Sequence, residues 1–363
     1  MNQQNYSRRD FLKLSALGLG AMAFRSSSIF SSFSDQITDS EKLGRVCVGS
    51  VNLRLKPNAD SQSLKTLYED QLIVWQRDVV GELPLGLLSR KWIETPEGYV
   101  YMPSVQPVKN LPNTPLAALP PDQPGQGFWA EVTIPFIDIV QANPPARSPW
   151  LQEIKLPRLY YSQIVWIDEI KTSNNDGKIY YHTSERYGSY GDTFWVPGEA
   201  FRPITTEELA PISPEVEEKR IDVHIPHQTL SCYEGNREVY FCRISSGTRY
   251  DSDGRPVDNW ATPLGPQPIW RKLVSIHMSG GATGAGWDTP GIGWTSLFNG
   301  EGVAIHSTFW HNNFGTPVSH GCVNAAPEDA KWVFRWTTPA VDYDPGDKTV
   351  QMPGGTIVNV IEA

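Results

Sequence analysis

Basic residues are scarce in this chain of 363 residues, and its longest apolar stretch is a short one near the N-terminus. Lys and Arg number 31 against 40 Asp and Glu, so the formal net charge is -9. Phosphate contacts need clustered Lys and Arg, and we therefore expect no nucleic-acid partner. No later segment reaches the roughly 18 apolar residues of a membrane span, so no stable span is expected either.

Cysteine is also scarce, with four in the chain. We expect Cys47, Cys232 and Cys242 to be buried apolar residues, because free Cys is among the most buried residue types. Cys232 and Cys242 flank a predicted turn at Gly235-Asn236. In a two-residue hairpin they would lie on opposite faces, so a disulfide between them would need a bulge or a longer loop.

The N-terminus carries the pattern Ser7-Arg8-Arg9-Asp10-Phe11-Leu12-Lys13, followed by an apolar stretch to Phe24. This pattern is typical of the twin-arginine export signal, which is an address rather than part of the fold. A basic N-terminal helix is the alternative. We predict a signal segment at 1–24 and a flexible, Ser-rich lead at 25–44, and we expect an exported protein in the periplasm or at the cell-wall surface.

Gly and Pro are frequent, at 30 residues each, which favours short strands and turns over long helices. A first unit is predicted at 45–108, with Val46 to Leu55 as one irregular strand. Further strands are expected at 71–76, 91–95 and 99–102. A Pro-rich linker is predicted at 109–127.

A second β-rich unit is predicted at 128–205, followed by a polar linker at 206–218. Its strands are expected at 163–170, 179–183 and 194–196. Its aromatic residues, like those of the first unit, are expected in the core rather than stacked on sugars.

The last unit is predicted to span 219–363. Its strands are expected at 220–225, 229–234, 237–245, 269–278 and 302–306. The Gly-rich segment 280–293 is predicted to be a mobile loop. Pro327 fits a first helical position, with acidic residues after it, and Ala330, Val333 and Phe334 keep helical spacing, which predicts a helix.

The remaining cysteine lies in a tight turn, Ser319-His320-Gly321-Cys322-Val323-Asn324, sixteen residues after His306. A Cys thiolate is a good nucleophile towards carbonyls, but it needs a base or positive potential nearby to lower its pKa from about 8.5. Glycine permits a sharp turn and leaves backbone N–H groups free to face an oxyanion. The pattern thus predicts a nucleophile, Cys322, and its base, His306.

Two other interpretations of these residues are weaker. A buried thiol with an unrelated histidine would suit an arbitrary Cys and His pair. A zinc site formed by His306, His311, His320 and Cys322 is disfavoured, because their spacings match no compact set of ligands. No metal and no cofactor are expected, and His182, His224, His227 and His277 are expected to be structural or surface histidines.

The segments 305–315 and 317–324 resemble the signature of the L,D-transpeptidase catalytic domain, often called the YkuD domain. Upstream segments agree with it: Ile221-Asp222-Val223, Gln228-Thr229-Leu230, Tyr233-Glu234-Gly235, Ser245-Ser246-Gly247, Thr262-Pro263-Leu264-Gly265 and His277-Met278. The resemblance implies a mainly β fold, with a β-sandwich catalytic domain and one helix behind the nucleophile.

The two preceding units resemble bacterial SH3-like modules, which are small β-barrels. The first carries Trp92-Ile93-Glu94 and Gly98-Tyr99-Val100, and the second echoes this pattern with Tyr180-Tyr181-His182 and Phe194-Trp195-Val196.

The family resemblance implies a reaction on peptidoglycan stem peptides. Cys322 would attack the carbonyl before the terminal D-Ala of a tetrapeptide and form a thioester. His306 would donate and accept the proton. The backbone of Gly321 and Cys322, with that of His320, would form the oxyanion hole. An amine acceptor gives transpeptidation, and water gives carboxypeptidase activity.

Four further residues are candidates for binding substrate: Ser307, Trp310, Ser319 and Asn324. Asn324 stands where many family members have Arg, so it keeps hydrogen bonding without charge. Ser307 stands where Gly is common, and it either holds the His306 imidazole or packs. Trp310 and His311 are either cleft residues or plain packing.

Three functions therefore compete. The first is an exported L,D-transpeptidase, acting as a monomer, that cross-links peptidoglycan or attaches proteins to it, with a role in cell-wall organisation and cell shape. The second is an L,D-carboxypeptidase with the same thioester. The third is a cell-wall-binding protein whose catalytic site is idle.

Overall fold

The computed structural model describes residues 42–84, 88–121, 126–154, 157–188, 190–250, 254–257, 260–280 and 287–362. The chain divides into the units Met1–Glu41 and Lys42–Ala363. The predicted signal segment and most of the predicted lead lie outside the described residues. The description below concerns the second unit.

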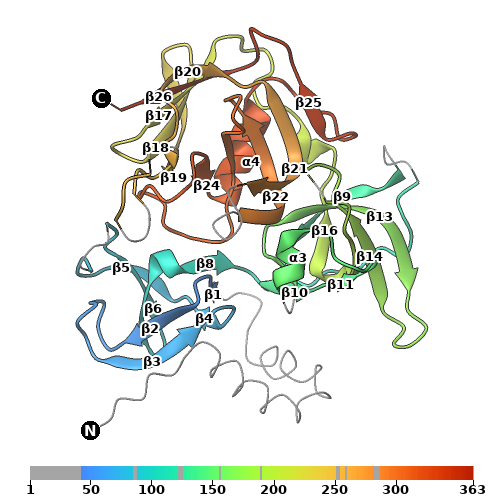
Figure 1. Ribbon diagram of the computed structural model, residues 1–363, viewed down its shortest axis with the longest axis horizontal. Helices are drawn as coiled ribbons and strands as arrows, with labels where there is room; N and C mark the ends of the chain where they lie inside the picture. Colours follow the sequence, from blue (N-terminus) through green and yellow to red (C-terminus); the bar gives the residue numbers. More distant parts are fainter. Residues whose placement is uncertain are drawn as a thin grey trace. The chain divides into compact units, whose positions relative to one another are not determined.

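The first module consists of two small antiparallel sheets (Figure 1). Its elements are β1 (Leu43–Val46), β2 (Ser50–Arg54), β3 (Ser63–Tyr68), β4 (Leu72–Val74), β5 (Arg77–Val80), β6 (Lys91–Thr95), β7 (Gly98–Tyr101), η2 (Met102–Ser104) and β8 (Val105–Val108). The strand orders are β4-β1-β8 and β3-β2-β7-β6-β5. The module has its own apolar core, which includes Val46, Leu53, Ile93 and Val100.

Two predictions for this module are wrong. The single strand from Val46 to Leu55 is two strands, β1 and β2, which belong to different sheets. The lead also ends earlier than residue 44, because Leu43 and Gly44 pair with both β4 and β8. Leu43 is 1% exposed, so burial of this side chain favours the earlier start of the strand.

The second module contains a sheet in the order β11-β15-β14-β13-β9-β16 and a pair, β10-β12. Its elements are β9 (Phe128–Val132), β10 (Phe136–Asp138), β11 (Val140–Gln141), α3 (Pro149–Glu153), β12 (Arg158–Tyr160), β13 (Ile164–Thr172), β14 (Ile179–Ser184), β15 (Thr193–Pro197), η4 (Gly198–Ala200), β16 (Phe201–Pro203) and η5 (Glu207–Leu209). Trp129, Trp166 and Tyr181 are buried, as predicted for core aromatics. The assignment of both modules as SH3-like stays a prediction.

The last unit is built on one large sheet in the order β20-β26-β17-β18-β19-β24-β23-β22-β21-β25. Its elements are β17 (Lys219–His224), β18 (Thr229–Glu234), β19 (Arg237–Ser245), β20 (Gly265–Pro268), β21 (Arg271–Gly280), β22 (Trp287–Leu297), β23 (Ala304–Ser307), β24 (Val323–Ala325), α4 (Pro327–Trp336), β25 (Asp347–Thr349) and β26 (Ile357–Ile361). The predicted mainly β class is confirmed.

The prediction of a mobile loop at 280–293 is wrong at Gly280, which ends β21, and from Trp287 onward. Residues 287–297 form β22, which pairs with β21 along its length. The glycines there permit a close approach to the second module rather than a loop. A Cβ at Gly293 would lie 2.6 Å from Cδ1 of Ile164, and Gly291 has a φ of 67°. Residues 281–286 lie outside the description.

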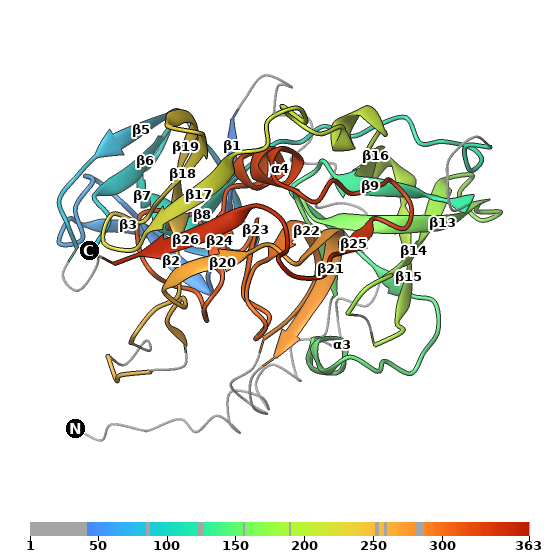
Figure 2. The same ribbon diagram turned by 90° about the horizontal axis from the view of Figure 1, so that it is seen from above.

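Helix α4 begins at Pro327, as the sequence predicts, with Glu328 and Asp329 in its first turn. Its buried face includes Ala330, Val333 and Phe334. The Phe334 ring meets the Trp294 ring of β22 edge-on at 5.4 Å. Figures 1 and 2 show the helix lying along the strands that carry the candidate site. The predicted helix behind the Cys322 turn is therefore present.

The second module and the large sheet share one apolar core. Trp129 of β9 donates from Nε1 to the Tyr343 carbonyl at 2.9 Å, and the Tyr343 hydroxyl accepts from Trp129 N at 3.0 Å. The predicted linkers are also held to the fold: Leu111 N donates to Thr133 O and Ile212 N donates to Arg335 O, each at 3.0 Å. These segments are packed connections rather than free tethers.

The hairpin β18–β19 has the predicted turn, since Glu234 pairs with Arg237. A bulge follows it, so that Cys232 faces Tyr240 while Cys242 faces Leu230. This register brings the two cysteines to the same face, yet both are free thiols in the buried core. The remaining cysteine of the first module, Cys47, is half-buried and free.

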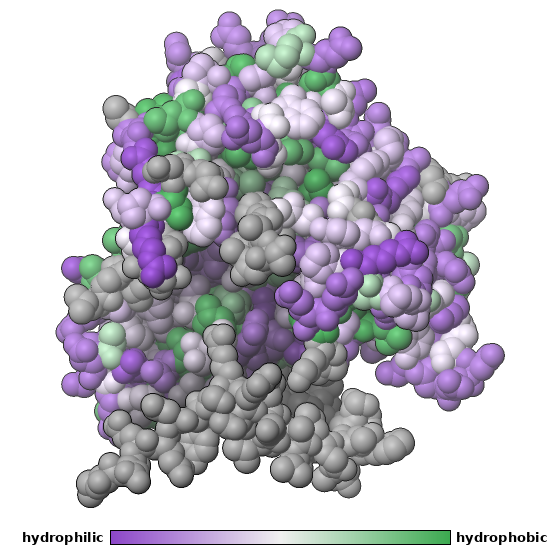
Figure 3. All heavy atoms as spheres, in the orientation of Figure 1, coloured by the Kyte–Doolittle hydropathy of each residue, from purple (hydrophilic) through white to green (hydrophobic). Residues whose placement is uncertain are grey.

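No helix in the described part of the chain is long and apolar enough to cross a membrane. The face shown in Figure 3 is dominated by hydrophilic residues, with apolar residues in separate spots.

Candidate active site

The candidate nucleophile and base lie on two neighbouring parallel strands. In the register of β23 and β24, Ile305 pairs with Val323 and His306 pairs with Asn324. Cys322 directly precedes β24, two residues before Asn324. Because side chains two residues apart share a face, Cys322 projects on the same side of the sheet as His306. The fold thus places Cys322 and His306, sixteen residues apart in the chain, on one face of two neighbouring central strands.

The Cys322 thiol is half-buried against a small apolar cluster formed by Leu273, Leu297 and Ala304. Burial raises its pKa to about 11, although a hydrogen bond from the Ala304 backbone lowers it. The free protein therefore holds a protonated thiol at neutral pH. Nucleophilic attack then requires a base to take the thiol proton as the new bond forms.

The imidazole of His306 is suited to be that base. The residue is 2% exposed, and its Nδ1 lies 2.9 Å from the carbonyl oxygen of Ser307. A carbonyl only accepts, so the ring proton is on Nδ1 and Nε2 carries the free lone pair. Burial lowers the pKa of His306 to about 4, so this ring is neutral at pH 7.

The Ser307 side chain does not hold the imidazole. Its Oγ accepts a hydrogen bond from the backbone N–H of Gly293 in β22, at 3.1 Å. The hydroxyl therefore ties the end of β23 to the adjacent strand, while the backbone carbonyl of Ser307 orients His306. The sequence left open whether Ser307 holds the imidazole or packs. Its backbone carbonyl holds the imidazole, and its hydroxyl contacts the neighbouring strand.

The turn before the nucleophile is held by its own serine. Gly321 has a φ of 122°, which favours glycine, and its N–H donates to Ser319 Oγ at 3.2 Å. The same hydroxyl donates to the carbonyl of Cys322. The N–H of Gly321 is thus engaged within the turn. The ring of His320 is exposed and meets Trp260 edge-on at 4.1 Å.

A residue that the sequence did not single out for the site lies behind this turn. The hydroxyl of Thr262 accepts from Gly247 N and donates to Gly321 O, both at 2.8 Å. Gly247 is required there, because a Cβ would lie 2.0 Å from the Trp260 carbonyl. Spacing gave no signal for Thr262, since it stands 59 positions before Gly321.

Trp310, His311 and Asn324 line up beside His306. The Trp310 ring lies 5.8 Å from that of His306. The side-chain amide of Asn324 lies 2.9 Å from Nε2 of His311, and Nδ1 of His311 accepts from Asn313 N at 3.1 Å. Asn324 is 2% exposed, so its amide serves His311 rather than open solvent. Binding of substrate by these residues stays a prediction.

Both modules contact the segment that carries Trp310 and His311. The buried Arg45 of β1 donates from Nη2 to the carbonyl of Phe309 at 3.1 Å. Tyr160 of β12 stacks on the Phe309 ring at 5.7 Å, and Asn312 N donates to Pro103 O at 3.2 Å. The candidate site therefore rests on all three parts of this unit.

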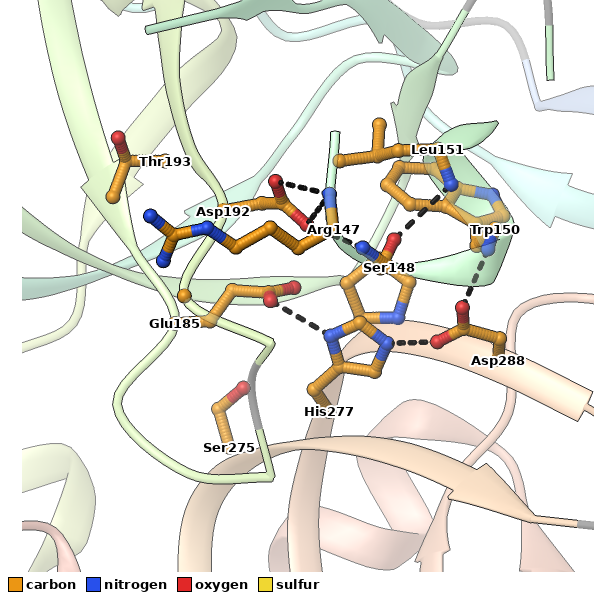
Figure 4. A network of polar contacts seen from close by, with 12 residues as sticks. Arg147, Ser148, Trp150, Leu151, Glu185, Asp192, Thr193, Ser275, His277 and Asp288 are labelled. Atoms are coloured by element: carbon orange, nitrogen blue, oxygen red, sulfur yellow. Dashed lines mark hydrogen bonds and ion pairs between the residues drawn. The ribbon is translucent and has the colours of Figure 1, made fainter. Parts of the chain in front are cut away.

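The hairpin of β21 and β22 is tied to the second module by a buried polar network (Figure 4). His277 of β21 lies between Glu185, at 2.7 Å from Nδ1, and Asp288, which contacts Nε2. Asp288 also accepts from Trp150 N at 2.6 Å. Burial disfavours charge on the imidazole, but the two carboxylates outweigh it and raise the pKa of His277. The histidine is structural, as expected.

The described residues contain no group of three or more His, Cys, Asp and Glu side chains that could hold a metal ion. The site contains the thiol of Cys322 and the imidazole of His306, whose Nε2 carries the lone pair. The turn before Cys322 has its backbone carbonyls held by hydrogen bonds. These are the parts of a Cys–His acyl-transfer site.

Comparison with known proteins agrees with this geometry. Residues 218–360 match the family model described as the L,D-transpeptidase catalytic domain, YkuD. A segment of 87 residues is 34% identical to the "Probable L,D-transpeptidase YbiS" of Escherichia coli strain K12. That match covers 21% of this chain and spans only 28% of the relative's length.

Solved structures of L,D-transpeptidases also align with part of the chain. The catalytic domain from E. faecium is 22% identical, with a TM-score of 0.30, over 40% of this chain and 98% of that one. The enzyme from Mycobacterium smegmatis is 18% identical, with a TM-score of 0.31, over 53% and 81%. The likeness to the family therefore rests on the family model: residues 218–360 match the L,D-transpeptidase (YkuD) catalytic domain.

Proposed function

We propose that this protein is a cysteine L,D-transpeptidase that acts on peptidoglycan stem peptides. The observation that carries the proposal is the common face of Cys322 and His306, within a domain that matches this family. The neutral, oriented imidazole supports His306 as the base.

The proposed reaction has two steps. The Cys322 sulfur bonds to the carbonyl carbon before the terminal D-Ala, while His306 Nε2 takes the thiol proton. The C–N bond breaks, the proton passes to the leaving amine, and D-Ala departs. An acceptor amine then bonds to the same carbon, the S–C bond breaks, and the amine proton returns through His306 to sulfur. The thioester keeps the energy of the cleaved bond.

The oxyanion of each tetrahedral intermediate needs backbone donors. We assign this role first to the N–H of Cys322, with that of His320, because the N–H of Gly321 already donates to Ser319. Substrate would enter beside Trp310, which stands next to His306 and is half-buried.

The test is to incubate the protein, without its signal segment, with a disaccharide-tetrapeptide and to follow products by mass spectrometry. A cross-linked dimer that requires Cys322 supports a transpeptidase, whereas a tripeptide alone supports an L,D-carboxypeptidase. Unchanged substrate, with acceptor supplied, would favour an idle wall-binding protein.

We further propose export by the twin-arginine route, on the pattern around Arg8 and Arg9. Replacing both with Lys should retain the protein in the cytoplasm; export that persists unchanged would contradict this route.

We propose that the first module, which has its own core, helps to bind the wall. A chain lacking 45–108 should then sediment less with purified sacculi than the complete chain does, and equal sedimentation would contradict the idea.

A further inference from the structure

Two carbonyl groups beside the nucleophile are fixed by side chains, and one of these side chains comes from a distant part of the chain. Ser319 holds the carbonyl of Cys322 from within the turn. Thr262, which precedes β20, holds the carbonyl of Gly321 at 2.8 Å. The residue between these two fixed carbonyls is the candidate nucleophile itself.

The two hydrogen bonds of Thr262 use the only proton of its hydroxyl and one of its acceptor sites. Its hydroxyl has one proton, which goes to Gly321 O, and its Oγ accepts from Gly247 N at 2.8 Å. The residue is 5% exposed, so water does not compete readily for the hydroxyl. Gly247 is itself fixed by a bridge to Ser319, and a Cβ added at Gly247 would stand 2.9 Å from Gly321 Cα, so the two backbones lie close together.

The geometry of the peptide bond links this contact to catalysis. Gly321 C=O and Cys322 N–H belong to one planar trans peptide, so they point in opposite directions. Holding the carbonyl towards Thr262 aims the N–H of Cys322 away from Thr262. Gly321 lacks a Cβ and has a positive φ, so this peptide can rotate more easily than one that follows another residue, and an external hold on it matters.

We infer that Thr262 is a positioning residue of the oxyanion hole, which fixes the direction of the Cys322 N–H through the carbonyl of Gly321. The inference rests on the proposed function only in taking Cys322 as the nucleophile of acyl transfer. It adds that a hydroxyl is required at position 262, and not merely a side chain of that shape.

Thr262→Val removes both hydrogen bonds at nearly constant volume, and Thr262→Ser keeps the hydroxyl. Two reactions of Cys322 separate positioning from other effects. Acetylation by p-nitrophenyl acetate passes through a tetrahedral oxyanion: the S–C bond forms, p-nitrophenolate leaves, and the thiol proton goes to His306. Alkylation by iodoacetamide displaces iodide at a saturated carbon and forms no oxyanion.

In the full chain, we expect Thr262→Val to slow acetylation by at least about tenfold, towards the 10²–10³ lost when an oxyanion donor is removed outright. Alkylation should stay within about twofold, and Thr262→Ser should restore acetylation to within a few-fold. Thermal melting of each variant reports folding.

Equal losses in both reactions, or normal acetylation by a folded Thr262→Val protein, would overturn the inference. Both reactions are measured without a peptidoglycan substrate. Failure of the wild type to act on tetrapeptide would therefore count against the proposed function alone, while the ratio of acetylation to alkylation still decides the role of Thr262.

Discussion

At the scale of single residues, the site combines a thiol of raised pKa with an imidazole of lowered pKa, and burial is the main cause of both shifts. The Cys322 thiol and the His306 imidazole are therefore both uncharged at neutral pH. This neutral pair differs from a preformed thiolate–imidazolium pair, in which the thiol would be ionised at neutral pH. Reactivity of Cys322 in the free protein should therefore be limited by its small thiolate fraction.

This predicts a pH profile. Alkylation of Cys322 by iodoacetamide should quicken about tenfold per pH unit between pH 7 and 9, because a thiol with a pKa of about 11 stays mostly protonated there. Mass spectrometry of the labelled site measures the rate, and Cys322→Ala gives the background from the other cysteines. A rate that is already level at pH 7 would mean that the dyad exists as an ion pair.

At the scale of elements, the hairpin β21–β22 depends on a histidine held between two carboxylates. The pKa of His277 is raised in the folded protein above its usual 6.5. Its stabilising effect is then fully present below pH 6.5 and is lost as the pH rises through the folded pKa.

His277→Gln keeps a hydrogen-bonding side chain but cannot take a charge. We expect the melting temperature of the wild type to exceed that of this variant by several degrees at pH 6 and by clearly less at pH 9. Differential scanning calorimetry of both proteins between pH 6 and pH 9 measures the difference in melting temperature. A difference that is independent of pH would show that the charge of His277 contributes nothing to stability.

Some elements of the fold can be predicted from the sequence, and others cannot. Helix α4 from Pro327, the hairpin β18–β19 and the pair of His306 and Cys322 follow from local signals: a proline, a turn and a spacing. The strand β22 could not be predicted from local signals, because its glycines are needed where Ile164 of another module packs closely against the strand. Thr262 lies in a segment that matches the family signature, but its contact with Gly321 spans 59 positions, so only the tertiary fold reveals that contact.

At the scale of the whole molecule, the two N-terminal modules pack directly against the last unit. Arg45 is 2% exposed and joins three partners: Asp70 at 2.8 Å, Gln106 at 3.0 Å and the carbonyl of Phe309. Its guanidinium also stacks on Tyr160, 4.0 Å from the ring centre. This one residue therefore connects both modules with the segment beside His306.

Arg45→Ala should lower the free energy of unfolding by about 2–4 kcal/mol, because it leaves the side-chain oxygen of Gln106 and the Phe309 carbonyl without their buried donor, while Asp70 keeps Arg158. A matched control is Arg77→Ala in the same module, whose 70% exposed side chain contacts Glu94; this variant should unfold at nearly the same urea concentration as the wild type. Urea denaturation measures both. Equal midpoints for the two variants would contradict a structural role for the Arg45 junction.

In the proposed reaction, Cys322 carries an acyl group cut from a stem peptide. Intact-mass spectrometry of the protein, mixed with disaccharide-tetrapeptide and quenched in acid, tests it most directly. We expect a protein heavier by the substrate mass less one D-Ala, with the adduct on Cys322 and absent from Cys322→Ala. Release of D-Ala that is equally fast in Cys322→Ala, or an adduct on another residue, would contradict it.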